Sequence, residues 1–210
     1  IDNLKLIKLQ EDSISENTCL HLGHAYLRLD DLEKAKLAYA TAIRYNIDPK
    51  LREEAMYNYV QATYLHNSAL GESVTAFQDF IHEYPNSQYI NKVYTLMADM
   101  YLTSKNYQAA LDALLTIPTP DDKMQETMQY LRYQLAVDAF VQGKMTDVIK
   151  WANLVIENAT QPSTYKTEAY YLAAQAHYRL HQYPQTIAQL QLYLEQSNIA
   201  ESTNKTMALY

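Results

Sequence analysis

The stretch from Glu16 to Ala42, ENTCLHLGHAYLRLDDLEKAKLAYATA, decides the fold. Its large and small residues alternate as two packed helices require: Cys19, Leu22, Gly23 and Tyr26, then Ala35, Tyr39 and Ala42. Cys19, Leu22 and Tyr26 fall on one stripe of a helix, at i, i+3 and i+7. Gly23 and Ala35 are small, so a second helix can approach closely. The stretch therefore predicts an antiparallel pair of helices.

The same frame recurs along the chain. Successive units start at Glu16, Glu54, Asn91, Gln129 and Thr167, with spacings of 38, 37, 38 and 38 residues. The matches are imperfect: Gln61 stands where a small residue is expected, Phe80 replaces the later Ala, and Arg132 and Ala139 replace the large residues of the fourth unit. Neither helix of a pair can bury its stripe alone, so each pair is expected to stack on the next.

This pattern resembles the tetratricopeptide repeat, with Cys19 in the place usually held by Trp. That family's repeat is about 34 residues, so the excess here indicates longer helices or links. The resemblance implies an all-α fold: a right-handed superhelical solenoid of antiparallel helix pairs.

We expect one repeat domain over 1–210, in a fragment of a longer chain. Its repeats are 16–53, 54–90, 91–128, 129–166 and 167–204, with partial helices at 1–15 and 205–210. Leu4, Leu6, Ile7 and Leu9 look like the end of an earlier unit, and a sixth unit would begin at Lys205. The proline-containing link 116–122 should shorten the third unit's second helix.

Composition excludes several classes of function. The formal charge of −7 speaks against nucleic-acid binding, which needs a basic face. No apolar run of about 18 residues is present, so we expect no membrane insertion. The three glycines and six prolines are too few for an all-β fold. Cys19 is the only cysteine, so no internal disulfide can form.

The resemblance also implies a peptide-binding groove. In the family, residues one, four, eight, eleven and twelve positions after each repeat start line the concave face. The residues expected to bind a partner are Tyr130, Tyr133, Phe140, Tyr171, Gln175, Tyr178, Arg179 and Asp99. Aromatic side chains make good anchors for a peptide, and Arg179 can hold a carboxylate. The alternative is that these tyrosines pack helices together, since the chain has 20 tyrosines.

We expect no enzyme activity, cofactor or metal site. No nucleophile elbow, phosphate-binding glycine loop or metalloprotease motif is present. Cys19 should face the partner helix and His24 the groove, so they do not converge on a metal ion. His177 and His181 lie four apart, but no acidic third ligand is fixed near them.

The segment Phe77–Ser87, FQDFIHEYPNS, resembles a narrower group. It is similar to repeat proteins of the bacterial cell envelope, such as the lipoprotein of outer-membrane β-barrel assembly and the periplasmic partner of the Tol–Pal system. This resemblance favours a periplasmic or outer-membrane-associated protein over a cytoplasmic one.

The sequence thus predicts a scaffold that binds a peptide or helix of a partner protein. Two alternatives stay open. The chain is a structural spacer that self-associates through uncapped ends, or it is a regulatory module of a larger protein.

Overall fold

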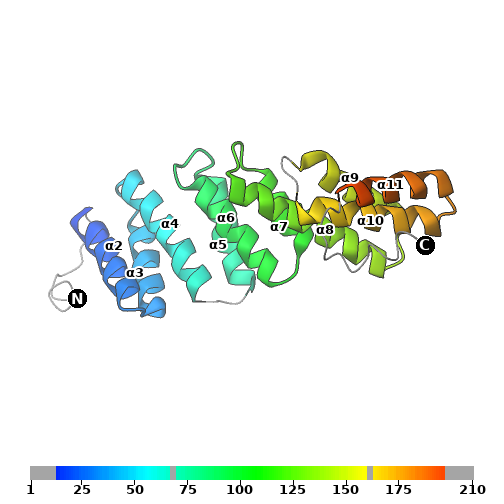
Figure 1. The fold of residues 1–210 in the computed structure, drawn as a ribbon. Coiled ribbons are helices and arrows are strands. Elements are labelled where there is room, and N and C mark those ends of the chain that lie inside the picture. Colours follow the sequence, from blue (N-terminus) through cyan, green and yellow to red (C-terminus); the bar gives the residue numbers. More distant parts are fainter. Residues whose placement is uncertain (1–12, 67–69, 160–162, 197–210) are drawn as a thin grey trace. The chain divides into compact units, whose positions relative to one another are not determined.

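The fold is all-helical in the part of the chain that the structure covers. The computed structural model describes residues 13–66, 70–159 and 163–196, and these contain ten helices (Figure 1). Their bounds are α2 (Ser13–Arg28), α3 (Leu32–Tyr45), α4 (Pro49–Leu65), α5 (Leu70–Glu83), α6 (Ile90–Thr103), α7 (Tyr107–Leu115), α8 (Asp122–Val141), α9 (Met145–Asn158), α10 (Thr164–Arg179) and α11 (Tyr183–Gln196). The predicted all-α helical repeat is confirmed.

The helices form five consecutive pairs, one for each predicted repeat. α7 has 9 residues where α3, α5, α9 and α11 have 14, so the expected shortening by the link 116–122 is confirmed. First helices begin before the predicted repeat starts: α8 begins at Asp122 rather than Gln129. The proposed earlier unit at Leu4–Leu9 and the sixth unit from Lys205 lie outside the described residues.

The chain divides into two compact units, residues 1–100 and 101–210, with the boundary inside α6. In the first unit, α2 packs on α3, and α4 packs on both. In the second, α8, α9 and α10 pack on one another, and α11 packs on α10. The single domain over 1–210 and the right-handed superhelix stay predictions.

The turn inside a repeat has the same backbone geometry in four of the pairs. A residue with positive φ stands in it: Asp30 (59°), Lys105 (57°), Gly143 (76°) and His181 (58°). The following residue donates its backbone N–H to a carbonyl five positions earlier, at 2.8–3.0 Å, and these bonds are Asp31–Tyr26, Asn106–Tyr101, Lys144–Ala139 and Gln182–His177. This is the Schellman arrangement, which ends one helix and reverses the chain.

The residue after the turn starts the second helix. The Asp31 carboxylate accepts from Lys34 N and the Asn106 side chain from Ala109 N, both at 3.3 Å. Each therefore caps a helix N-terminus, while its own N–H closes the preceding helix. Because one residue serves both helices, the turn is short and each pair is antiparallel.

Close approach of α2 and α3 depends on Gly23. The Tyr39 ring, which is fully buried, lies against the Gly23 backbone. A Cβ at position 23 would lie 2.9 Å from Tyr39 Cζ and closer still to two other ring carbons. The small residue predicted at this position is thus required by the ring opposite it.

Buried carboxylates fix the links between repeats in the first unit. Glu16 is fully buried and accepts hydrogen bonds from the backbone N–H groups of Ile47 (3.3 Å) and Asp48 (2.9 Å). Glu53, 37 positions later, accepts from Ser87 Oγ at 2.5 Å. Each carboxylate near the start of a first helix thus ties down the chain entering the next repeat.

We expect Gly23→Ala to destabilise the protein. Overpacking against Tyr39 should outweigh the higher helix propensity of Ala, for a net loss of about 1–2 kcal/mol in the free energy of unfolding. Urea unfolding followed by circular dichroism measures it. Adding Tyr39→Leu to the variant should restore stability; if Gly23→Ala alone is neutral, the close approach is not a constraint.

Replacing Lys105 by Gly should stabilise the second unit by about 1 kcal/mol, because Gly accepts the positive φ of this turn without a Cβ penalty. Thermal unfolding of Lys105→Gly against Lys105→Ala separates this effect from loss of the charge. Equal melting temperatures for the two variants would contradict the assigned turn geometry.

Candidate functional site

Five of the eight residues predicted to bind a partner line one pocket. Its volume is about 740 Å³, and it lies within the second unit between α10, α11 and the end of α8. The described lining residues are Phe140, Tyr171, Ala174, Gln175, Tyr178, Arg179, Tyr183, Thr186, Ile187 and Leu190. The volume is within the usual range of ligand sites, roughly 300–1,000 Å³.

The pocket follows from helical spacing on two adjacent helices. Tyr171, Gln175 and Tyr178 lie at i, i+4 and i+7 of α10 and so share one face. Tyr183, Ile187 and Leu190 repeat that spacing on α11. The three-residue turn between the helices places the two faces side by side.

The α11 side of the pocket is missing from the sequence prediction. Tyr183, Thr186 and Leu190 are recognisable as repeat positions, but the groove rule considers only the first helix of each pair. The signal was present in the spacing of Tyr183, Ile187 and Leu190, which indicates one apolar face on the second helix.

The pocket has a buried wall and an exposed rim. Tyr171 is 9% exposed, and its ring packs on that of the fully buried Tyr193 at 5.3 Å. Tyr178 and Ile187 are 61% and 58% exposed. The Tyr178 and Tyr183 rings meet edge to face, with centroids 6.0 Å apart. Large apolar side chains at the rim are therefore accessible to a partner.

Arg179 is the one charged residue in the described lining. Its guanidinium carbon lies 4.3 Å from the centre of the Phe140 ring, which is a cation–π contact. The described residues offer Arg179 no carboxylate within ion-pair distance. Stacking holds the plane of the guanidinium and leaves its N–H edge available for an anion.

Tyr130 and Tyr133 lie elsewhere in the second unit and pack helices together. Both ring centroids are 5.8 Å from that of Tyr165, at the start of α10, and Tyr130 also meets Tyr107 edge to face. Tyr133 packs against Ala152 and neighbouring small residues, and burial raises the pKa of its phenol. These two rings join α8 to α10.

Asp99 belongs to the first unit and is engaged by Tyr64. The Tyr64 hydroxyl donates a hydrogen bond to the Asp99 carboxylate. This bond, assisted by burial, raises the pKa of Tyr64 to about 12. Asp99 is therefore a partner of a helix-packing tyrosine and does not lie at the pocket.

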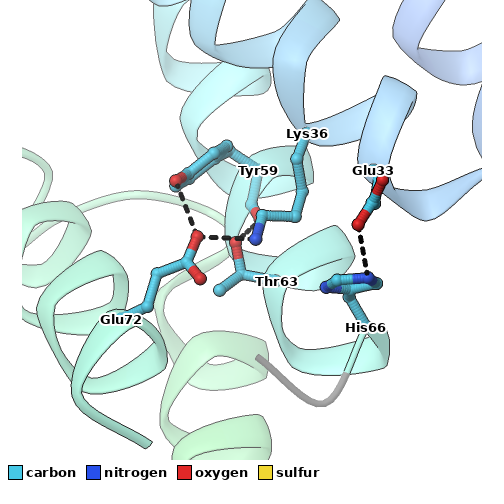
Figure 2. A network of polar contacts seen from close by, with 6 residues as sticks. All are labelled: Glu33, Lys36, Tyr59, Thr63, His66 and Glu72. Atoms are coloured by element: carbon cyan, nitrogen blue, oxygen red, sulfur yellow. Dashed lines mark hydrogen bonds and ion pairs between the residues drawn. The ribbon is translucent and has the colours of Figure 1, made fainter. Parts of the chain in front are cut away.

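A second cluster of polar side chains joins three helices of the first unit. Figure 2 shows Lys36 of α3, Tyr59 of α4 and Glu72 of α5 meeting at one carboxylate. Lys36 Nζ lies 2.6 Å and the Tyr59 hydroxyl 3.4 Å from Glu72 Oε1. His66 Nε2 lies 3.7 Å from Glu33 Oε1 beside them. The arrangement links consecutive helices and encloses no pocket of its own among those found.

The residues weighed as metal ligands have other surroundings. Cys19 is buried in the α2–α3 core, and burial raises the pKa of its thiol. The His24 ring meets Tyr39 edge to face, and burial lowers its pKa. His177 Nδ1 pairs with Gln182 at 2.6 Å. Within the described ranges, no three His, Cys, Asp or Glu side chains gather in one place.

None of the described helices is both long and apolar enough to span a bilayer.

Comparisons with known proteins find likeness at the level of solved structures. Neither a protein-family model nor a curated protein sequence matches the chain. Among similar structures is the TPR2AB domain of yeast Sti1 in complex with pHSP90, at 14% identity, TM-score 0.47, and coverage of 88% of this chain and 78% of that one. MamA of AMB-1 has 13% identity and TM-score 0.46, covering 93% and 98%. PilF of Pseudomonas aeruginosa has 12% identity and TM-score 0.40, covering 91% and 79%.

The neighbours are tetratricopeptide-repeat structures, but these scores carry no conclusion about partners. The tetratricopeptide-like fold of the chain rests on its own five helix pairs and their repeated turn.

We expect Asp99→Ala to lower the pKa of Tyr64 from about 12 toward its ordinary value of 10. The raised pKa means that the fold favours the neutral phenol. Its stabilisation is therefore complete below pH 10 and is lost as the pH rises from 10 to 12. Ring-carbon NMR of labelled tyrosines follows the titration. Asp112→Ala, which removes a carboxylate bonded to Gln108, is the control and should leave Tyr64 unchanged.

Proposed function

We propose that this chain is a non-catalytic protein-interaction module that binds a peptide or helix of a partner protein at the α10–α11 pocket. The observation that carries the proposal is the coincidence, at one pocket, of exposed aromatic side chains with an unpaired arginine. Aromatic residues and arginine are the side chains most enriched at the energetic centres of protein interfaces.

Each component has a physical role in binding. Tyr178 and Tyr183 present large surfaces that lose little rotamer entropy on binding. Arg179, held by the Phe140 ring, is pre-organised to receive a carboxylate and so needs less ordering. Since the whole chain carries a charge of −7, this cation also selects against most other acidic contact surfaces.

The chemistry of the lining favours binding over catalysis. The described lining contains no Cys, His, Asp or Glu. Its hydroxyl groups, on Thr186 and three tyrosines, therefore have no general base within the pocket to activate them. A pocket of this composition can recognise a ligand but has no evident means of moving a proton.

A cell-envelope location is part of the proposal and rests on the resemblance of the segment 77–87. In the first unit, Phe77 and Phe80 of this segment are core residues, and the Tyr84 hydroxyl accepts from Arg52 at 3.0 Å. These contacts explain the segment by packing. The periplasmic or outer-membrane-associated location is therefore supported by the resemblance alone.

A structural spacer that self-associates is the second candidate function. Exposed apolar side chains favour it, because Ile187 and Tyr178 could also be covered by a second copy. The mass of the protein in solution discriminates the two candidates: a spacer of this kind associates with itself as its concentration rises.

Ile187→Glu tests the proposal with a matched control. It places a charge in the apolar part of the pocket, whereas Leu115→Glu does so at a site of equal exposure, 55% against 58%, outside it. We expect a partner captured by the parent chain, and re-bound after purification, to bind Ile187→Glu at least about tenfold more weakly. Leu115→Glu should bind as the parent does.

Equal binding by the parent and both variants would place recognition elsewhere. Loss of self-association in Ile187→Glu, with no other partner bound by the parent, would make the spacer the function.

A further inference from the structure

The repeat frame relates the pocket to a surface of the first unit. Asp30 and His181 are equivalent turn residues, 151 positions apart (181 − 30 = 151). Subtracting this offset places the nine lining residues of α10 and α11 on Leu20, Gly23, His24, Leu27, Arg28, Leu32, Ala35, Lys36 and Tyr39 of α2 and α3. The two sets occupy the same positions on two helix pairs.

In the first unit a helix covers that surface. Leu20 and Tyr39 pack in one buried cluster with Ala55 and Ala62 of α4. His24 Nε2 lies 3.8 Å from Glu54 Oε1, also on α4. The α2–α3 equivalent of the pocket is thus filled by the first helix of the next repeat.

The second unit gives an independent example. α10 packs on α8 and α9. It contributes Ala176 to a cluster with Ala139 and Val148, and it contributes Ala169 and Ala173 to a cluster with Ala152 and Val155. Both covering helices, α4 and α10, present fully buried alanines to the pair beneath. Small residues on the incoming helix are therefore a shared feature of this contact.

The pocket chemistry also favours a helix over an extended chain. Its described polar side chains, beyond the tyrosine hydroxyls, are Gln175, Arg179 and Thr186. An extended peptide buried there would leave most of its N–H and C=O groups unpaired, which is costly. A helix satisfies these groups internally, as α4 and α10 do on their own surfaces.

Resting on the proposed function, we propose that the pocket binds an amphipathic α-helix of a partner protein, laid over α10 and α11 as α4 lies over α2 and α3. The helix presents small residues at i and i+7, the spacing of Ala55 and Ala62, and carries a carboxylate for Arg179. Charge complementarity supports this occupant, because Arg179 is the one charged group in the described lining.

The partner helix differs from α4 in what it meets. The pocket has Tyr171 and Tyr178 where α2 has Leu20 and Leu27, so its α10 wall is larger and aromatic. It has Ile187 where α3 has Lys36, the residue that pairs with Glu72. The acidic side chain of the partner is therefore needed near the end of α10, where Arg179 stands.

The test uses the full chain and a synthetic helix of known sequence. The probe is a fluorescent 17-residue peptide with the α4 sequence, Pro49–Leu65, constrained as a helix by a staple. Its matched control carries Asn58→Pro, which breaks the helix with little change in composition. We expect the constrained helix to bind at least about tenfold more tightly than the control by fluorescence anisotropy.

Variants of the chain assign the binding to the pocket. Ile187→Glu and Arg179→Gln should each weaken binding of the helix by about tenfold, and Leu115→Glu and Lys150→Gln should not. A photoreactive residue at position 187 should crosslink to the added helix.

Other outcomes overturn the inference. Equal or tighter binding of the Asn58→Pro peptide would make the ligand an extended chain, and the proposed interaction function would stand. No binding of either peptide, or a crosslink from position 187 to residues 197–210 or to a second copy, would show that a partner helix is not the occupant. Failure of the interaction function itself would appear separately, as equal binding of the captured partner by Ile187→Glu and the parent.

Discussion

The structure depends on a backbone hydrogen bond that spans five residues and closes each helix pair. In four turns, an N–H bonds the carbonyl five positions earlier around one residue with positive φ. This bond fixes where the first helix ends and where the second begins. Once the direction of both helices is set, their apolar stripes face each other, and the interhelical contacts follow. The recurrence of the turn after 38 residues between Lys105, Gly143 and His181 gives the fold its period.

The helix pairs could be predicted because their contacts follow a fixed spacing. Gly23 opposite Tyr39 is legible as a small residue facing a large one, and the structure places the ring against that backbone. The turns could not be located as well, since three of the four left-handed residues are not glycine. The early start of α8 was also missed, because Asp121 caps it through Met124 N while the repeat pattern begins only at Gln129.

The candidate site was predictable in part for the same reason. A rule based on first helices finds Tyr171, Gln175 and Tyr178, because they share a face of α10. It cannot separate them from Tyr133, which has the same position in its own repeat but is covered by Tyr165. Whether a tyrosine binds a partner or packs a helix depends on the element that lies over it. That information is three-dimensional, and no spacing within one helix contains it.

Equivalent positions in a repeat protein become informative where their residues differ. A surface that always receives the next helix tends toward one solution: Leu20, Gly23 and Tyr39 in the first unit enclose the alanines of α4. At α10 and α11 the same positions hold Tyr171, Ala174 and Leu190, so aromatic bulk has moved from the second helix to the first. A helix shaped for one surface does not match the other. The exchange of Lys36 for Ile187 moves the cation as well, from α3 in the first unit to Arg179 of α10. Selectivity for a particular helix therefore follows from substitutions at positions whose role in the fold is unchanged.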